Sequence, residues 1–173
     1  MSTSTLKTCA EGSGVATGEA KAHSIGIAGL AVVIAPDTVR TVLGSCIGAA
    51  LFDTQTGVGG MVHIILPSAS QGSGDPKKFA DTAIDMLVTE MISAGAQKSR
   101  IQAKIVGGAC MFGDEQTVGL GRRNVEAVEA ELARHAIPLT ASCVGGTKGR
   151  RMVLDPSTGN IDVAVIGEPS RIL

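Results

Sequence analysis

Aromatic residues are nearly absent from this chain: tryptophan and tyrosine do not occur, and phenylalanine occurs three times in 173 residues. Proteins that bind single-stranded nucleic acid stack its bases on aromatic side chains and attract its phosphates with positive charge. The chain has few of the former, and its formal net charge is −1. Composition therefore argues against a nucleic-acid partner and leaves the core to Ile, Val, Leu, Met and Ala.

Long apolar runs and metal-binding patterns are missing as well. No run approaches the roughly 20 apolar residues that span a bilayer. The four cysteines and three histidines include no Cys-x-x-Cys pair and no set with zinc-ligand spacing. We therefore expect no metal, no cofactor and no membrane insertion, and we expect reduced thiols in a cytoplasmic protein.

The first 24 residues are rich in Ser, Thr, Gly and Ala and contain no continuous apolar segment. Such a segment cannot bury a core, and it lacks the apolar stretch of a signal peptide. The composition predicts a disordered N-terminal tail over residues 1–24, which includes Cys9, followed by one domain over residues 25–173.

Local patterns in the domain predict an α/β or α+β fold, a single domain in which a mixed β-sheet with hairpins is layered against two main α-helices. Asp75 is expected to cap the first helix, Pro76 to occupy its first position and Gly95 to end it. Residues 109–121 are expected to form a loop. The expected helices are 76–94 and 122–136; the expected strands are 25–34, 39–43, 47–52, 58–66, 101–106, 137–144 and a closing hairpin over 151–167 that turns at 156–159.

One cysteine and one histidine stand in a plain stretch of small and apolar residues, LGSCIGAALFDTQTGVGGMVHIILP, whose two strand-length runs predict a β-hairpin. If the four residues TQTG form the loop, Asp53 pairs with Val58. Counting back along both strands, Gly48 then faces His63. Cys46 lies two residues before Gly48 and points to the same face, diagonally opposite His63. A loop with an odd number of residues would place the thiol and the imidazole on opposite faces.

A thiol beside an imidazole is a typical nucleophile and base, and the imidazolium can protonate a departing amine. The small residues Gly44 and Ser45 leave the thiol of Cys46 accessible, and backbone N–H groups around it can stabilise an oxyanion. The hydroxyl of Thr41 is a candidate, by position alone, for orienting the imidazole. The alternative interpretation is structural: a buried cysteine is ordinarily a small core residue, a lone histidine in a strand is ordinarily held by one hydrogen bond, and glycines can mark a bulge.

Six segments in order resemble the CheD family of chemoreceptor glutamine deamidases, with coverage from about residue 25 to about residue 166. The first two resemble the segments that carry the nucleophilic cysteine and the histidine of the family. Two positions depart from the family pattern: Cys110 stands where Asn or Ser is frequent, and Val62 stands where a polar residue is frequent. The segments are TVLGSCIGAALFD, GVGGMVHIILP, KKFADTAIDMLVTEM, KIVGGACMF, GLGRRNVEAVEAEL and GGTKGRRMVLDPSTG.

The resemblance implies a Cys–His–Thr deamidase in which the family motif falls on Cys46, His63 and Thr41, with Thr38 a second hydroxyl close by. It implies attack of the thiolate on a receptor glutamine and a thioester intermediate. The implied partners are methyl-accepting chemotaxis receptors and a CheC-type phosphatase. Two alternatives stay open: a non-catalytic adaptor that binds receptor or phosphatase, and a thiol hydrolase that acts on receptor methyl esters.

Two further glycine segments have two interpretations each. Gly107 and Gly108, followed by Met111 and Phe112, form either a wall of the site with its oxyanion region or a tight turn after a strand. The segment from Gly119 to Asn124 is either an anion cradle or, as we favour, a helix cap.

Two expectations concern residues near the C-terminus. Cys143, in an apolar strand, is expected in the core. The short basic cluster of Lys148, Arg150 and Arg151 is expected on a solvated face.

Overall fold

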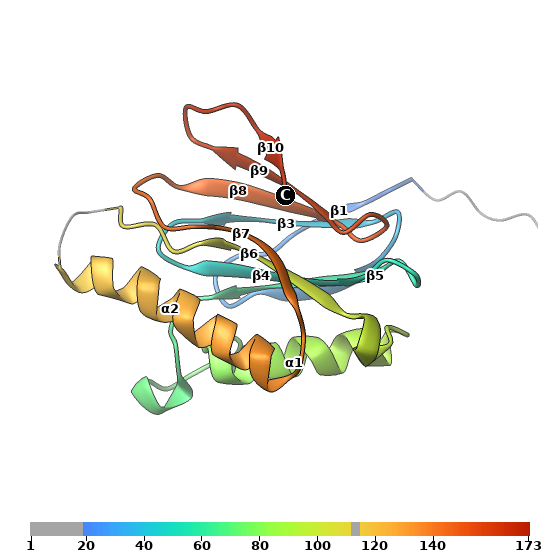
Figure 1. Ribbon diagram of the computed structural model, residues 1–173, viewed down its shortest axis with the longest axis horizontal. Helices are drawn as coiled ribbons and strands as arrows, with labels where there is room; N and C mark the ends of the chain where they lie inside the picture. Colours follow the sequence, from blue (N-terminus) through green and yellow to red (C-terminus); the bar gives the residue numbers. More distant parts are fainter. Residues whose placement is uncertain (1–18, 112–114) are drawn as a thin grey trace, which may run out of the picture.

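The described residues form two five-stranded sheets and two long helices, and Figure 1 shows them as stacked layers. The computed structural model describes residues 19–111 and 115–173. One sheet, called here the outer sheet, lies on the other, the central sheet, whose far face is covered by the helices. The expected α+β class is confirmed, and the strands divide between two sheets.

The outer sheet has a parallel pair at one edge, where β1 runs beside β3, and is otherwise antiparallel. The central sheet is antiparallel except for the parallel pair of β6 and β7. In spatial order the outer sheet consists of β1 (Ala22–Ser24), β3 (Thr38–Leu43), β8 (Arg150–Asp155), β9 (Asn160–Val165) and β10 (Arg171–Ile172), and the central sheet of β2 (Leu30–Ile34), β5 (Val58–Ile64), β4 (Ile47–Asp53), β6 (Gln102–Gly107) and β7 (Leu139–Val144).

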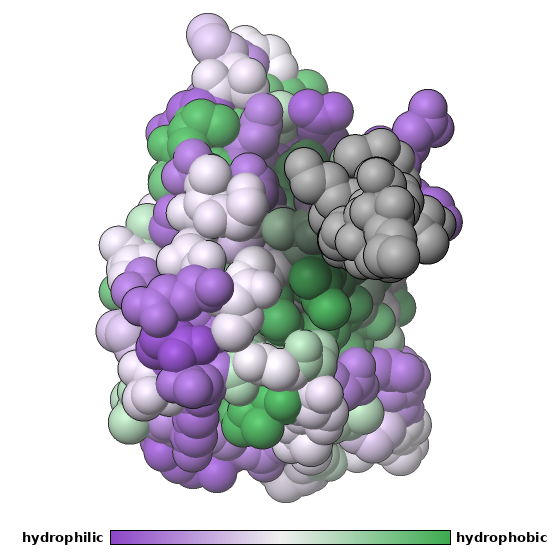
Figure 2. Space-filling model, turned by 90° about the vertical axis from the view of Figure 1, so that its right-hand side faces the viewer, coloured by the Kyte–Doolittle hydropathy of each residue, from purple (hydrophilic) through white to green (hydrophobic). Residues whose placement is uncertain are grey.

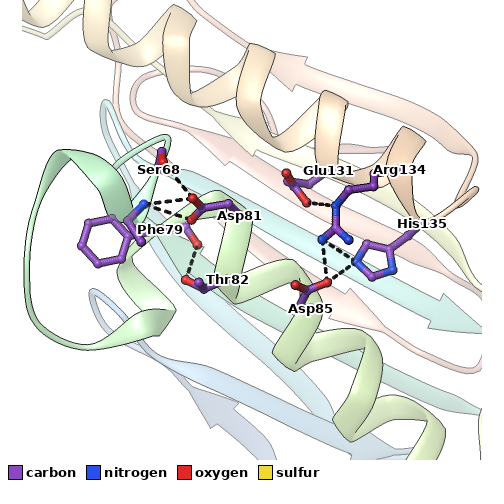
Figure 3. Close-up of polar contacts among 9 residues, drawn as sticks. Ser68, Phe79, Asp81, Thr82, Asp85, Glu131, Arg134 and His135 are labelled. Carbon is purple, nitrogen blue, oxygen red and sulfur yellow. Dashed lines mark hydrogen bonds and ion pairs between the residues drawn. The ribbon is translucent and has the colours of Figure 1, made fainter.

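The helices α1 (Ala80–Ser93) and α2 (Glu115–Arg134) pack against one another as well as on the sheet. Figure 3 shows how their polar edges meet: Asp85 of α1 lies 2.6 Å from Arg134 Nη2 and 2.6 Å from His135 Nε2. Glu131 lies 2.7 Å from Arg134 Nε. The part of the chain that the structure describes also contains three short 3-10 helices: η1 (Ala69–Gln71), η2 (Pro76–Lys78) and η3 (Lys98–Arg100).

Strands β4 and β5 are buried along their whole length because both faces of the central sheet are covered. Their alternate side chains enter two cores, one shared with the helices and one shared with the outer sheet. The helix-side core includes Ile47, Ala49, Leu51, Val62, Ile84, Leu87, Ile105 and Leu132, and the core between the sheets includes Leu43, Ala50, Phe52, Met61, Met152 and Leu154.

The register expected for the β4–β5 hairpin is confirmed: Asp53 pairs with Val58, and Gly48 pairs with His63. The turn lies at the end of the molecule that Figure 2 shows, where apolar side chains gather among polar ones. Its anchor is the carboxylate of Asp53, which is 1% exposed and lies 2.8 Å from Arg100 Nη2. Burial alone would raise the pKa of Asp53, but hydrogen bonds from Arg100 and from two backbone N–H groups lower it to about 2.

Some boundaries expected from the sequence are wrong. The segment 25–34 is not one strand, because the chain turns at Ala28, where φ is 57°, and β2 begins only at Leu30. Strand β1 lies just before the domain boundary expected at residue 25, and residues 1–18, with Cys9, lie outside the described part of the chain.

The first helix begins later than expected and the second begins earlier. Asp75 caps the 3-10 helix η2 rather than α1, which starts at Ala80, whereas Gly95 ends it as expected with φ at +105°. Helix α2 starts at Glu115. The loop expected over 109–121 is therefore wrong from residue 115 onward, and residues 119–124, which were expected to form a helix cap, lie inside the helix. Gly121 lies inside this helix at a position that a larger residue does not fit, because a Cβ there would stand 2.6 Å from the carbonyl oxygen of Gly108.

Replacing Asp53 by Asn is expected to lower the free energy of unfolding by about 2 kcal/mol at neutral pH. The pKa of Asp53 is depressed in the folded state, so its contribution is present above the unfolded value of 3.8 and is lost as pH falls through about 2. Urea unfolding of both proteins between pH 7 and pH 2 measures the difference. Glu126→Gln, at a site whose side chain is 63% exposed, is the control and should change stability little. A difference that persists unchanged at pH 2 would contradict the prediction.

Candidate active site

The candidate residues come from both sheets. Cys46 lies in the turn that joins β3 of the outer sheet to β4 of the central sheet. His63 is the penultimate residue of β5, and Thr41 lies on β3 with its side chain turned inward between the sheets. His63 is 3% exposed and Thr41 is 2% exposed. The hairpin thus brings the turn that carries the thiol to the end of the strand that carries the imidazole.

A hydrogen bond joins the two sheets at this point: Thr41 Oγ1 lies 2.9 Å from His63 Nδ1. The same hydroxyl oxygen lies 2.9 Å from the carbonyl oxygen of Ile25. A carbonyl oxygen only accepts, and a threonine hydroxyl has one hydrogen, so Thr41 donates to Ile25 and accepts from Nδ1–H of His63. The neutral ring therefore carries its proton on Nδ1 and a free lone pair on Nε2.

The position of the ring is fixed from the main chain as well. The N–H of His63 donates to Gly29 at 2.9 Å, and its carbonyl oxygen accepts from Ala28 at 3.1 Å. His63 Nε2 is buried and has no hydrogen-bond partner in the described part of the chain. An orphaned acceptor of this kind is costly in a folded protein and marks a position where a proton donor is expected.

Burial makes both candidate groups neutral. It lowers the pKa of His63 below 6.5. It raises the pKa of the half-buried Cys46 thiol above 9.0, while the Ser45 hydroxyl and the backbone N–H of Cys46 act in the opposite direction. Consistent with a neutral thiol and a neutral imidazole, the structure contains no hydrogen bond between the Cys46 sulfur and His63 Nε2. His63 is therefore in the form of a base rather than of a preformed imidazolium.

The turn that carries Cys46 is held by its carbonyl groups. The carbonyl of Gly44 accepts from the N–H of Ala109, and that of Cys46 accepts from the N–H of Gly108, both at 2.8 Å. The N–H groups of residues 44–46 donate to no main-chain carbonyl of the described residues. They remain available to a developing oxyanion, which is the arrangement that an acyl-transfer site requires.

Gly107 and Gly108 lie directly behind this turn. The N–H of Gly108 is engaged by Cys46, and a Cβ on Gly107, where φ is +120°, would overlap the carbonyl oxygen of Cys46. Their conformation lets the end of β6 approach the turn closely. Met111 is 41% exposed and its sulfur lies against Gly44, so it forms one wall of the site, whereas Phe112 lies outside the described residues.

Asn124 of α2 is a buried polar residue that the sequence analysis placed at a helix cap. Its Nδ2 lies 3.0 Å from the carbonyl oxygen of Ile65 and 3.5 Å from that of Ser45, and its side chain is fully buried. One side chain thus connects the segment after His63 with the residue before Cys46. The available signal was its position on the helix, four residues before the buried Val128 on the same face.

The segment after β5 is fastened to α1, as Figure 3 shows. The carboxylate of Asp81 accepts from the hydroxyl of Ser68 at 2.8 Å and from the N–H of Ala69 at 3.0 Å. This contact holds the chain beyond His63 against the first turn of the helix.

No group of three or more His, Cys, Asp or Glu side chains that could hold a metal ion occurs within the described residues. Over the same part of the chain, no helix is both long and apolar enough to cross a bilayer.

Comparisons with known proteins point to one family. A family model described as CheD chemotactic sensory transduction matches residues 65–165, a span that begins two residues after His63. Curated relatives cover more of the chain. A protein of Desulfitobacterium hafniense, named probable chemoreceptor glutamine deamidase CheD, is 46% identical over 155 residues, which are 87% of this chain and 97% of that protein.

Two clostridial relatives with the same name agree with this match. The one from Clostridium tetani is 45% identical and covers 87% of this chain and 95% of its own length. The one from Clostridium botulinum is 43% identical, with coverage of 83% and 92%. Among solved structures, the Bacillus licheniformis hypothetical protein YfiH reaches a TM-score of 0.37 at 15% identity over 61% of this chain and 46% of its own, a likeness too slight to support an argument.

Thr41→Val is expected to remove the acceptor that fixes the ring proton on Nδ1 of His63. Nitrogen NMR of the imidazole should show the Nδ1–H tautomer in the wild type and in Thr41→Ser, and a mixture of tautomers in Thr41→Val. Stability should fall by about 1 to 3 kcal/mol because a buried N–H and a buried carbonyl lose their partner. Thr38→Val is the matched control. An unchanged tautomer in Thr41→Val would show that Thr41 does not select it.

The rate at which iodoacetamide alkylates Cys46 is expected to rise about tenfold per pH unit between pH 7 and pH 8.5. The reason is that burial raises the pKa of this thiol, so the thiolate is a minor species that grows with pH throughout this range. Peptide mass spectrometry separates Cys46 from the other three cysteines. A rate that is constant between pH 6 and pH 8 would indicate a preformed thiolate–imidazolium pair and would contradict the neutral assignment.

Proposed function

The chain belongs to the CheD family, and on that basis we propose that it deamidates glutamine side chains of chemoreceptors, with Cys46 as the nucleophile and His63 as the base. The names of the curated relatives support the reaction and the substrate class. The observation that carries the residue assignment is the contact between Thr41 and His63, which leaves Nε2 unprotonated beside the turn of Cys46.

The first half of the proposed reaction forms a thioester. As the sulfur of Cys46 attacks the side-chain amide carbon of a glutamine, its proton moves to Nε2 of His63. The carbonyl oxygen becomes an oxyanion, which the N–H groups of residues 44–46 stabilise. The imidazolium then gives the proton to the amide nitrogen, the C–N bond breaks, and ammonia leaves. Protonation at this step is essential because an amide anion is too basic to depart.

The second half returns the enzyme to its starting state. Neutral His63 takes a proton from water, hydroxide attacks the thioester carbon, and the C–S bond breaks to give glutamate. The proton returns from the imidazolium to the thiolate of Cys46. Thr41 accepts a hydrogen bond from Nδ1–H throughout, which stabilises the imidazolium, although less than a carboxylate would.

The free protein is in a resting state for this chemistry. A neutral thiol without a hydrogen bond to Nε2 needs a small rearrangement before it can lose its proton, and catalytic contacts commonly tighten when substrate binds. The partly exposed Cys46 lies on a turn, and a change of its side-chain rotamer is the rearrangement that we propose.

The partners follow from the same proposal. The substrate is a protein glutamine on a chemoreceptor, and family membership suggests a CheC-type phosphatase as a second partner. Two other activities compete with the deamidase: an adaptor that binds receptor without chemistry, and a hydrolase that cleaves receptor methyl esters through the same thiol.

The decisive test is conversion of glutamine to glutamate in a purified receptor cytoplasmic fragment, mapped by peptide mass spectrometry. Cys46→Ala is expected to lower the rate at least 100-fold, because no other group can form the thioester. Cys110→Ala removes a nearby thiol that the mechanism does not use and should retain the wild-type rate. Hydroxylamine should intercept the thioester and convert the target glutamine to a hydroxamate.

Each competing activity gives a different result in this assay. Receptor binding without conversion by the wild type would favour the adaptor. Release of methanol from methylated receptor without amide conversion would favour the esterase. Full deamidation by Cys46→Ala would refute the assignment of the nucleophile.

A further inference from the structure

A second polar site lies where strand β7, at the edge of the central sheet, faces β8 and the segment that includes β10 of the outer sheet. A pocket of about 500 Å³ opens there, and its lining includes Cys143, Lys148, Arg150 and Arg171. Cys143 is buried, as its place in an apolar strand predicts. Arg150 is only 6% exposed, so the expectation that it lies on a solvated face is wrong.

Arg150 is a buried cation without a counter-ion. Its Nη1 donates to the carbonyl oxygen of Cys143 at 2.7 Å and lies 3.2 Å from the sulfur of that residue. Its Nη2 donates to the carbonyl oxygens of Gly145 and Lys148. No carboxylate of the described residues is paired with it, and its Nε is buried with no partner. A buried charge held only by neutral acceptors is costly.

A second guanidinium, that of the exposed Arg171, lies beside the first. Arg171 Nη2 lies 2.7 Å from the sulfur of Cys143, so two guanidinium groups converge on one sulfur atom. Arg171 also has no carboxylate partner within the described part of the chain. Lys148 is the third cation of the lining, and it is compensated by Glu168 at 3.0 Å. Two guanidinium groups of the lining therefore have no carboxylate partner within the described residues.

The loop beside the pocket is suited to an anion as well. Gly145 and Gly146 have φ values of +77° and +73°, which side chains other than glycine rarely adopt. The N–H groups of residues 146–149 donate to no main-chain carbonyl of the described residues. Free N–H groups next to guanidinium groups form the kind of concave site that binds oxyanions.

We propose that this pocket binds an anionic group of carboxylate or phosphate chemistry, which Arg150, Arg171 and the free N–H groups of the loop hold together. The ligand offsets the positive charge of the two guanidinium groups. Guanidinium groups favour such ligands because their N–H donors match the spacing of two oxygen atoms.

The loop that lines the pocket is hydrogen-bonded to the segment behind the turn of Cys46. The N–H of Gly145 donates to Gly107 at 2.9 Å, and the N–H of Cys110 donates to Gly146 at 2.8 Å. Arg150 pairs across the outer sheet with Leu43, three residues before Cys46. Resting on the deamidase function proposed above, we assign the anion to an acidic side chain of the protein substrate close to the target glutamine.

The first experiment measures binding without catalysis. Thermal unfolding is followed with increasing inorganic phosphate, and in parallel with glutarate, while sodium chloride keeps the ionic strength constant. The wild type should show a saturable stabilisation, because a ligand that binds only the folded state raises its stability. Arg171→Gln should weaken the apparent affinity at least tenfold. Arg151→Gln removes the same charge from the next residue of β8, whose side chain is exposed, and should bind as the wild type does.

Two results of this experiment would overturn the site. One is a response to both anions that is the same in the wild type and in Arg171→Gln, which would show a general effect of salt. The other is binding by Cys143→Ala but not by the wild type, which would show that the thiolate of Cys143 already supplies the negative charge.

The second experiment identifies the source of the anion with the receptor fragment as substrate. If an acidic side chain of the substrate occupies the pocket, Arg171→Gln raises KM for deamidation with little change in kcat, and phosphate inhibits the wild type competitively. If phosphate binds but KM is the same in the wild type and in Arg171→Gln, the pocket binds a free anion and the assignment to the substrate is wrong. Failure of the wild type to deamidate would refute the proposed function and leave the binding result intact.

Discussion

The hydrogen bond from His63 to Thr41 crosses the interface between two sheets that otherwise meet through apolar side chains. It depends on three strands at once. β5 presents the imidazole, β3 presents the hydroxyl, and the chain just beyond β1 supplies the carbonyl of Ile25, whose need for a donor fixes the direction of the hydroxyl. A slip of one residue in any of these pairings would turn a side chain away and leave a buried N–H without a partner. The same hydrogen bond therefore ties the packing of the two sheets to the position of the proton on the His63 ring.

Burial keeps both the proposed base, His63, and the proposed nucleophile, Cys46, neutral in the free protein. A preformed ion pair would keep a reactive thiolate exposed to oxidants and other electrophiles. A thiol that is deprotonated only as substrate arrives is protected until it is needed. The free N–H groups of the turn at residues 44–46 complete the arrangement, because they favour negative charge on the substrate oxygen that forms during the reaction.

The hairpin register was predictable because the turn between β4 and β5 contains four residues, which pairs Asp53 with Val58 and thereby fixes the pairs that follow. The start of α2 was not predictable, because Gly119 and Gly121 lie close together and argue against a helix. Only the structure explains Gly121, through its close approach to Gly108. Asn124 and Arg150 were also misplaced. From the sequence alone, a polar residue is expected to be exposed. The carbonyl groups that accept hydrogen bonds from these two side chains come from distant parts of the chain or from irregular loops.

Most of the buried side-chain polar atoms that lack a hydrogen-bond partner lie near one of the two candidate sites. Four such side-chain atoms occur in the described residues, and three of them belong to His63, Asn124 and Arg150, around the turn of Cys46 and the loop behind it. Polar residues in general are not gathered at this end of the molecule, since exposed charges and hydroxyls occur over the whole surface. Buried donors and acceptors are ordinarily paired, and each exception in a folded protein needs an explanation. The lone pair on His63 Nε2 and the N–H on Arg150 Nε are two such exceptions, and on them depends our proposal of a substrate that offers both an amide and a negative charge.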